Sequence, residues 1–264
     1  MIEIRPRRPL FHRSRGGSNP YVILVLLGLV VGSIFLWRSV ETRQIISPFE
    51  PTPTPTRTAN SFSMEGETYF QAGNIQAAIT AYQRALEPEP TNVALYAELA
   101  RIQVYSSAVL STDNDRRLRL QEARQVSEKA VELDPQSSLA AAVNAFVLNW
   151  NANPTLYDPA TAQKTLLAAE LEAVRALNLE KNNTLAMAYY AEILADQQKI
   201  VQARQYIQQA LATGEDVMDV HRVLAYVNES EGNYGEAIKE YKRAAEITPN
   251  LTFLYIAIGL NYRV

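Results

Sequence analysis

The chain of 264 residues contains no cysteine and only two histidines, His12 and His221. The missing cysteines exclude disulfide bonds, thiolate metal sites and a cysteine nucleophile. With so few histidines, the common catalytic triads and histidine-based metal centres lack members. The sequence also lacks GxxxxGK[ST] and GxGxxG phosphate-binding loops. We therefore predict that the protein is not an enzyme and uses no metal or cofactor.

One carboxylate pair remains open to a catalytic interpretation. Glu192 and Asp196 are four residues apart, which places them on one face of a helix, where they are able to form a general acid and base. Like charges at this spacing are more often solvated neighbours without a chemical role.

Positive charge is also scarce in most of the chain. Residues 59–264 contain 17 Lys and Arg against 25 Asp and Glu, which gives a net charge of about −8 and repels phosphate groups. The one basic cluster follows Asp113 and Asp115 and is typical of a solvated helix face; it comprises Arg116, Arg117, Arg119, Arg124 and Lys129. We expect no nucleic-acid partner.

A long uncharged run occurs at residues 21–37, YVILVLLGLVVGSIFLW. As a helix it would measure about 26 Å, close to the ~30 Å hydrocarbon core of a bilayer. Tyr21 and Trp37 lie at its ends, as interfacial aromatic residues do. The run lacks the polar face of a core helix and the small-x-small cleavage site of a signal peptide. We predict a single transmembrane helix at residues 21–37.

The flanks of this run set its orientation. Residues 1–20 form a basic tail with one acid and five arginines, namely Arg5, Arg7, Arg8, Arg13 and Arg15. Because only Arg38 and Arg43 follow closely, the positive-inside rule predicts a cytoplasmic amino terminus at the plasma (cytoplasmic) membrane, with the rest of the chain outside. Gly28 and Gly32 form a small-xxx-small pair that would allow a homodimer. Residues 38–58, which include SPFEPTPTPTRT, predict an extended stalk.

An internal repeat occupies residues 59–264. Residues 73–90 and 232–249 share a plan in which glycine precedes an Ala-x₆-Ala helix that proline ends. The alanine pair occurs five times, at Ala78 and Ala85, Ala123 and Ala130, Ala169 and Ala176, Ala203 and Ala210, and Ala237 and Ala244. Alanines seven residues apart share a helix face, so each copy predicts a hairpin of two closely packed helices.

The spacing of these pairs is uneven. They advance by 45, 46, 34 and 34 residues, so the second and third copies carry extra residues. Residues 106–115 and 151–159 are rich in turn formers, and we expect them to be long loops between the two helices of each copy. Leu156 and Tyr157 would form a contact point on such a loop.

These residues resemble the tetratricopeptide repeat (TPR) family. The resemblance rests on the first copy and on the fifth, which shows Gly232, Asn233, Tyr234, Ala237, Tyr241, Ala244 and Pro249. It implies an all-α fold, a right-handed superhelix of antiparallel helix pairs, with about five repeats and the first helix of a sixth. Residues 251–264 begin that sixth unit with a nearly uncharged segment, which we expect to expose apolar surface and to associate.

The resemblance also places side chains on the concave groove of such a superhelix. They are aromatic and charged, and comprise Phe70, Arg101, Tyr105, Tyr189, Glu192, Arg222 and Tyr226. This mixture is typical of protein–protein contacts. His221 is expected to pack between helices. The resulting hypothesis is a membrane-anchored scaffold that binds a protein or peptide. The alternative is a regulatory or targeting module of a membrane-anchored enzyme whose catalytic domain lies beyond residue 264.

Overall fold

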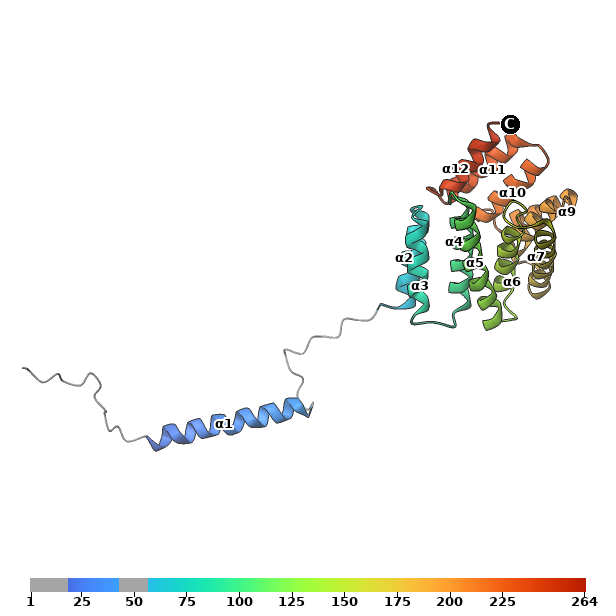
Figure 1. Cartoon of the computed structure of the whole chain (residues 1–264). Coiled ribbons are helices and arrows are strands. Elements are labelled where there is room, and N and C mark those ends of the chain that lie inside the picture. The colour runs from blue at the N-terminus through green and yellow to red at the C-terminus, as the bar shows by residue number, and fades with distance from the viewer. Residues whose placement is uncertain (1–18, 43–56) are drawn as a thin grey trace, which may run out of the picture. The chain divides into compact units, whose positions relative to one another are not determined.

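The computed structural model describes residues 19–42 and 57–264, and every regular element in these ranges is an α-helix. The chain divides into two compact units, Met1–Thr56 and Arg57–Val264. The described part of the first unit is α1 (Pro20–Glu41), and the second unit contains α2 to α12 (Figure 1). Most of the expected basic tail and stalk lies outside the described residues.

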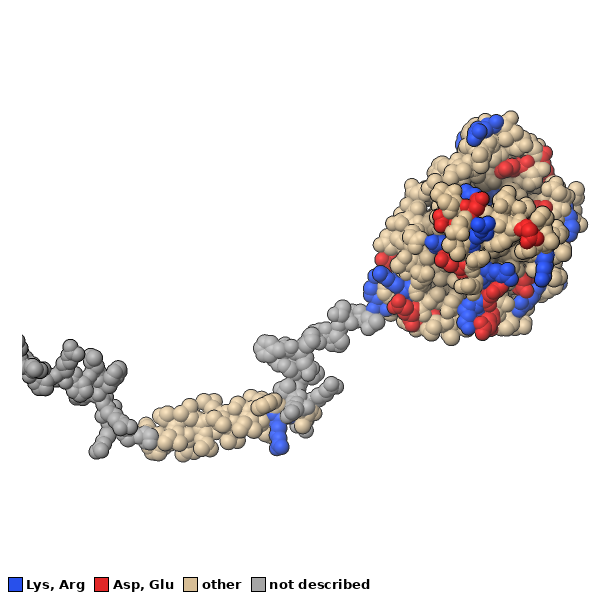
Figure 2. Space-filling model, viewed as in Figure 1, with Lys and Arg blue, Asp and Glu red and all other residues tan. Residues whose placement is uncertain are grey.

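Helix α1 has the length and composition that the uncharged run predicts. Its 22 residues correspond to about 33 Å. Within Pro20–Ser39, an 18-residue window has a mean hydropathy of 2.3, and none of it is buried. The surface of α1 in Figure 2 is accordingly free of charged side chains over nearly its whole length. It is the one described helix that is long and apolar enough to cross a membrane.

The second unit is a right-handed superhelix of antiparallel helix pairs. The pairs are α2 (Ala59–Gln71) with α3 (Ile75–Leu86), α4 (Val93–Ala108) with α5 (Asp113–Leu133), α6 (Ser138–Asn151) with α7 (Pro159–Leu179), α8 (Thr184–Asp196) with α9 (Ile200–Thr213), and α10 (Met218–Ser230) with α11 (Tyr234–Ile247). Helix α12 (Thr252–Asn261) follows and packs on α11. The first helices α4, α6, α8 and α10 contact one another in order and form an inner row.

Local sequence signals explain where the helices begin and end. Many helices start at a side chain that accepts a bond from the first-turn N–H groups, including Asn74, Asn92, Thr112, Ser137, Asp158 and Asn183. Gly73 and Gly232 follow α2 and α10 with φ of 77° and 78°, the left-handed conformation that ends a helix. Gln198 takes the same conformation after α8 with φ of 61°, although it is not glycine.

The repeated alanines lie at the helix contacts, as predicted. All ten members of the five pairs have exposed fractions of 1% or less. Ala237 and Ala244 are examples, because both lie on the α11 face that packs on α10. A small side chain at these positions allows two helix backbones to approach closely, so the Ala-x₆-Ala spacing is a packing signal.

The two expected loops have different outcomes. The loop of the third copy is present at residues 152–158, between α6 and α7. In the second copy α4 and α5 include most of residues 106–115, and only residues 109–112 connect the two helices. Helices α5 and α7 are 21 residues each and take up most of the extra length of the second and third copies. Asp113 and Asp115 lie in the first turn of α5, where acidic residues favour the positive end of the helix dipole. Leu156 is buried and Tyr157 half-buried, so this pair is part of the core and not an exposed contact point.

The segment before and within α12 reaches the inner face of the superhelix. Asn250 donates a hydrogen bond from Nδ2 to the carbonyl oxygen of Gln71, 3.2 Å away at the end of α2. The Phe253 ring stacks on the Tyr105 ring, with centroids 4.7 Å apart and planes 7° from parallel. Leu251 and Leu254 are fully buried. Part of the apolar surface of residues 251–264 is therefore covered inside the domain. Exposed apolar side chains remain on α12, namely Tyr255, Ile256 and Leu260.

The contact between Asn250 and the first repeat provides a paired test. A Cβ added at Gly73 would overlap the carbonyl oxygen of Asn250, whereas one added at Gly232 would meet nothing within 4 Å. Both positions have positive φ, so Gly232→Ala measures the backbone cost alone, about 1 to 2 kcal/mol. We expect Gly73→Ala to lower the free energy of unfolding by about 1 to 3 kcal/mol more than Gly232→Ala does. Urea unfolding of the two variants checks this. Equal losses of unfolding free energy would contradict the contact between Asn250 and the end of α2.

Candidate functional site

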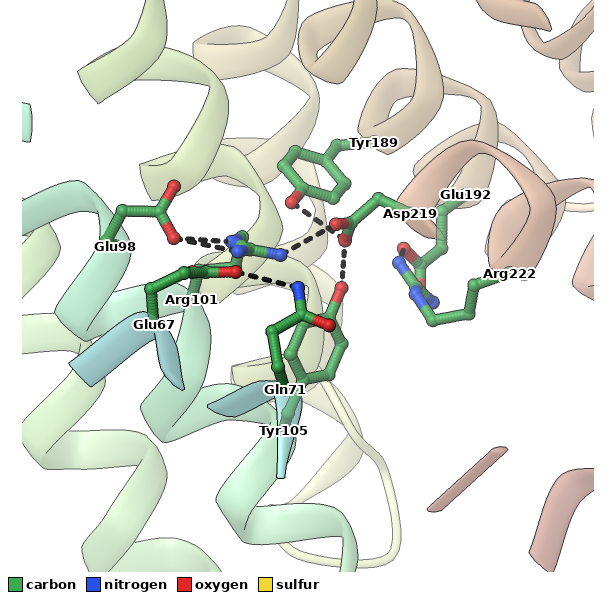
Figure 3. A network of polar contacts seen from close by, with 9 residues as sticks. All are labelled: Glu67, Gln71, Glu98, Arg101, Tyr105, Tyr189, Glu192, Asp219 and Arg222. Carbon is green, nitrogen blue, oxygen red and sulfur yellow. Dashed lines mark hydrogen bonds and ion pairs between the residues drawn. The ribbon is translucent and has the colours of Figure 1, made fainter. Parts of the chain in front are cut away.

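A buried carboxylate, Asp219, lies at the centre of the inner face. It is in the first turn of α10 and is 2% exposed. Its Oδ1 accepts hydrogen bonds from the hydroxyl groups of Tyr105 and Tyr189, the latter at 3.0 Å, and its Oδ2 is 2.8 Å from Arg101 Nη1 (Figure 3). Arg101 also binds Glu98 at 2.7 Å. Three inner helices, α4, α8 and α10, thus converge on one charge.

The ionisation of this cluster follows from its burial. Burial lowers the pKa of Arg101, but the negative charges of Glu98 and Asp219 raise it by more than burial lowers it. The guanidinium therefore stays protonated. Burial, together with the negative charge of Asp219, raises the pKa of Tyr189 well above its usual value, so its hydroxyl remains a donor. The cluster is a fixed structural network at physiological pH.

A second buried ion pair lies one helix turn from Asp219. Arg222 binds Glu192 through two parallel bonds, Nη1 to Oε1 at 2.9 Å and Nη2 to Oε2 at 2.6 Å. Trp150 Nε1 donates to the same carboxylate at 3.2 Å. The guanidinium also lies over the Phe146 ring, 5.2 Å from its centroid. This geometry neutralises both charges and holds the Trp150 indole in place.

A cavity of about 780 Å³ opens beside this ion pair. Its walls come from the inner helices α6, α8 and α10, from the start of α7 and from α12. Helix α12 contributes the apolar Phe253, Ile256, Ala257 and Leu260 together with the polar Asn261, so most of its share of the lining is apolar. The volume is in the range typical of ligand-binding clefts.

Asp196 lies at this cavity and is exposed to it. It accepts hydrogen bonds from the hydroxyl of Tyr226 and from Asn149 Nδ2, the latter at 2.8 Å. Protein surrounds the carboxyl on several sides, and this desolvation, with the charge of Glu192 nearby, raises its pKa to about 6 despite the two bonds. A carboxylate with a perturbed pKa in a cavity is a recurring feature of functional sites.

Glu229 is a second carboxylate at the cavity. Its Oε2 accepts from the hydroxyl of Tyr241 at 3.2 Å and from Asn261 Nδ2 at 3.1 Å, which joins α10 to α11 and α12. Within Arg57–Val264, neither Asp196 nor Glu229 forms an ion pair. The cavity therefore carries two carboxylates that hydrogen bonds hold in place and no protein cation neutralises.

The groove residues expected from the sequence occupy two different environments. Glu192, Arg222 and Tyr226 line the cavity. The other four are packed inside the domain, with Phe70, Tyr105 and Tyr189 buried and Arg101 half-buried. Whether any of the seven contacts a partner stays a prediction. His221 is buried and bonds to Glu240 and to the carbonyl of Glu215, each at 2.7 Å.

Several cavity residues were not anticipated from the sequence. Trp150, Asn149 and Glu229 lie on inner helices at positions that the repeat pattern marks as facing inward, so the helical period was a usable signal for them. Asp196 was interpreted as a solvated neighbour of Glu192, but the two carboxylates have different partners. No sequence signal placed Phe253 there, because its contact with Tyr105 depends on where α12 packs.

Two segments of the chain match family models. Residues 66–104 match a model described as TPR repeat, and residues 191–251 match one described as tetratricopeptide repeat. The second unit therefore contains tetratricopeptide repeats. No curated protein sequence matches it.

The chain is also similar to solved structures. It is similar to TTC0263, a thermophilic TPR protein of Thermus thermophilus, with 19% identity, a TM-score of 0.60, and coverage of 78% of this chain and 100% of that one. A second match is PilW, described as a widely conserved type IV pilus biogenesis factor, with 16% identity, a TM-score of 0.47, and coverage of 75% and 90%. At 19% identity, the likeness to TTC0263 concerns the fold alone.

The raised pKa of Asp196 predicts a pH-dependent stability. Because the folded-state pKa of about 6 lies above the ordinary value of 3.8, the stability contribution is complete below pH 3.8 and is lost as pH rises through 6. We expect Asp196→Asn to raise the melting temperature above pH 6 and to flatten its fall between pH 3.8 and 6.

A matched variant separates this effect from a general loss of negative charge. Glu132 is an exposed carboxylate on the outer helix α5. We expect Glu132→Gln to keep the pH profile of the parent in the same thermal denaturation series. If Asp196→Asn also keeps it, the assignment of the raised pKa is wrong.

Proposed function

We propose that the protein is a membrane-anchored TPR scaffold that binds a segment of another protein in the cavity on its inner face. The TPR fold itself suggests a protein–protein interaction scaffold. The observation that carries the proposal is the cavity of about 780 Å³ between the inner row and α12. It combines an apolar wall with fixed polar groups, as binding clefts do. Trp150 and Tyr226 supply aromatic anchors.

The proposed membrane anchor is helix α1. Its length and hydropathy suit a bilayer span, and the excess of arginine in residues 1–20 supports a cytoplasmic amino terminus. We therefore propose that the TPR domain lies outside the cytoplasmic membrane, at the end of a stalk.

Position-specific crosslinking tests the binding site. Gln163 is exposed and lines the cavity, whereas Gln121 is exposed on the outer helix α5. A photoreactive amino acid at Gln163 is expected to yield a discrete crosslinked protein in intact cells, because a bound segment would pass within reach. The same group at Gln121 is expected to yield none. Equal products from both positions, or none from Gln163, would contradict a cavity-bound partner.

Protease accessibility tests the topology. In cells whose outer layers have been removed, added protease is expected to degrade residues 59–264 and to leave an amino-terminal tag protected. Degradation of the tag with protection of the TPR domain would show the opposite orientation. Cell lysis serves as the control, because both parts should then be cleaved.

We also propose that α1 supports a homodimer through Gly28 and Gly32. An added Cβ at either position would meet nothing within 4 Å in a single chain, so both sites are open to a second helix. Replacing both glycines with isoleucine is expected to reduce crosslinked dimers in membranes at least severalfold. Unchanged crosslinking would exclude this pair as the contact.

A further inference from the structure

The cavity has two unlike walls that together define the chemistry of its ligand. One wall is apolar and is made by Ile256, Ala257 and Leu260 of α12 with Leu166 of α7. The other wall carries the ionisable groups Glu192, Asp196, Arg222 and Glu229. A ligand that fits both walls needs apolar groups on one side and a polar group on the other.

The charges of the polar wall do not cancel. Arg222 and Glu192 neutralise each other through their bidentate pair. Asp196 and Glu229 remain, and the hydrogen bonds that they accept come from neutral groups, namely the tyrosine hydroxyls and the asparagine amides. The cavity therefore has a net negative charge, and it favours a cation.

Most of the buried polar atoms of this wall that lack a hydrogen-bond partner are acceptors. Asn149 Nδ2 donates to Asp196, and Asn261 Nδ2 donates to Glu229 and to the carbonyl oxygen of Ala257. Within the described part of the second unit, Asn149 Oδ1 and Asn261 Oδ1 have no hydrogen-bond partner, although both side chains are more than nine-tenths buried. Among the buried lining atoms without a hydrogen-bond partner, the one donor is Arg222 Nε. Acceptors in excess match a ligand rich in donors, such as an ammonium or guanidinium group.

Aromatic rings complete the same pattern. The Trp150 indole and the Tyr226 ring both line the cavity, on α6 and α10. Their hydrogen-bonding groups are already used, by Glu192 and by Asp196, so their ring faces are what they offer to a ligand. Aromatic faces attract cations, and guanidinium groups stack on them.

We infer that the cavity binds a lysine or arginine side chain flanked by apolar residues, with Asp196 and Glu229 facing the cation. This inference rests on the proposed function, because it specifies the chemistry of the bound protein segment. The long stem of a basic side chain packs on the α12 wall while its charged end reaches the carboxylates.

Peptide selection on the full chain tests the inference. The protein is reconstituted in lipid nanodiscs, and a random dodecapeptide library is selected on it and, in parallel, on the double variant Asp196→Asn, Glu229→Gln. We expect peptides enriched on the parent to contain Lys or Arg between apolar residues. Replacing that Lys with norleucine, or an Arg with citrulline, is expected to weaken binding about tenfold or more, since it removes a charge-assisted bond.

Two controls locate the effect. Trp37→Phe leaves Trp150 as the single tryptophan of the chain, so its emission reports on occupancy of the cavity. The double variant is expected to weaken the basic peptide at least fivefold and to leave the norleucine or citrulline peptide unchanged. Glu132→Gln, which removes an exposed charge from α5, is expected to change neither affinity. Spermidine is included as a competitor, to distinguish a free polyamine from a peptide side chain.

The outcomes separate the inference from the proposed function. If enriched peptides change Trp150 emission but lack a basic residue, or tolerate its neutral replacement, the cationic ligand is wrong while the binding function holds. If spermidine changes the emission and no selected peptide does, the ligand is a small amine, and both statements are overturned. If neither changes it, the cavity binds no such ligand, and both fail.

Discussion

The bonds to Asp219 are the constraint on which the inner face of this TPR domain depends. Tyr105 and Arg101 reach it from α4, 114 and 118 residues away in sequence, and Tyr189 reaches it from α8. A buried carboxylate without these partners would carry a large desolvation penalty, so the three helices are held at separations that allow every bond to form. These bonds therefore tie α4 and α8 to the start of α10, in the inner row beside the cavity.

Charge compensation changes from one part of the inner face to the next. Around Asp219 and Arg222 every charge has a close partner of opposite sign, and the network is closed. At the cavity, Asp196 and Glu229 have only neutral donors. The raised pKa of Asp196 shows that keeping its carboxylate ionised there opposes folding.

Helix α12 has a different role from the first helices of the preceding repeats. It packs on α11, inserts Phe253 against Tyr105 and supplies the apolar wall of the cavity. The segment that precedes it contacts the first repeat through Asn250 and Gly73. The last helix thus narrows the concave surface that a regular superhelix would leave open, and one bounded cavity replaces part of a continuous groove.

Residue type and spacing by themselves determined the repeat architecture and the apolar helix α1, whereas the groove residues were expected only from the resemblance to the TPR family. Glycine at positive φ, asparagine at helix starts and alanine at seven-residue intervals act within one hairpin, so their effect is local. The glycine signal for a helix end did not apply to α8, because Gln198 takes the left-handed conformation there in place of glycine. Turn-forming residues correctly predicted the loop of the third copy, residues 152–158, but in the second copy α4 and α5 include most of residues 106–115. The extra residues of both copies mainly lengthen α5 and α7. Only the tertiary structure decided that Asp219 joins three helices, that Asp196 and Glu229 share a cavity, and that Phe253 meets Tyr105. These contacts join residues of different repeats, and they depend on how the repeats curve, which is a property of the whole stack.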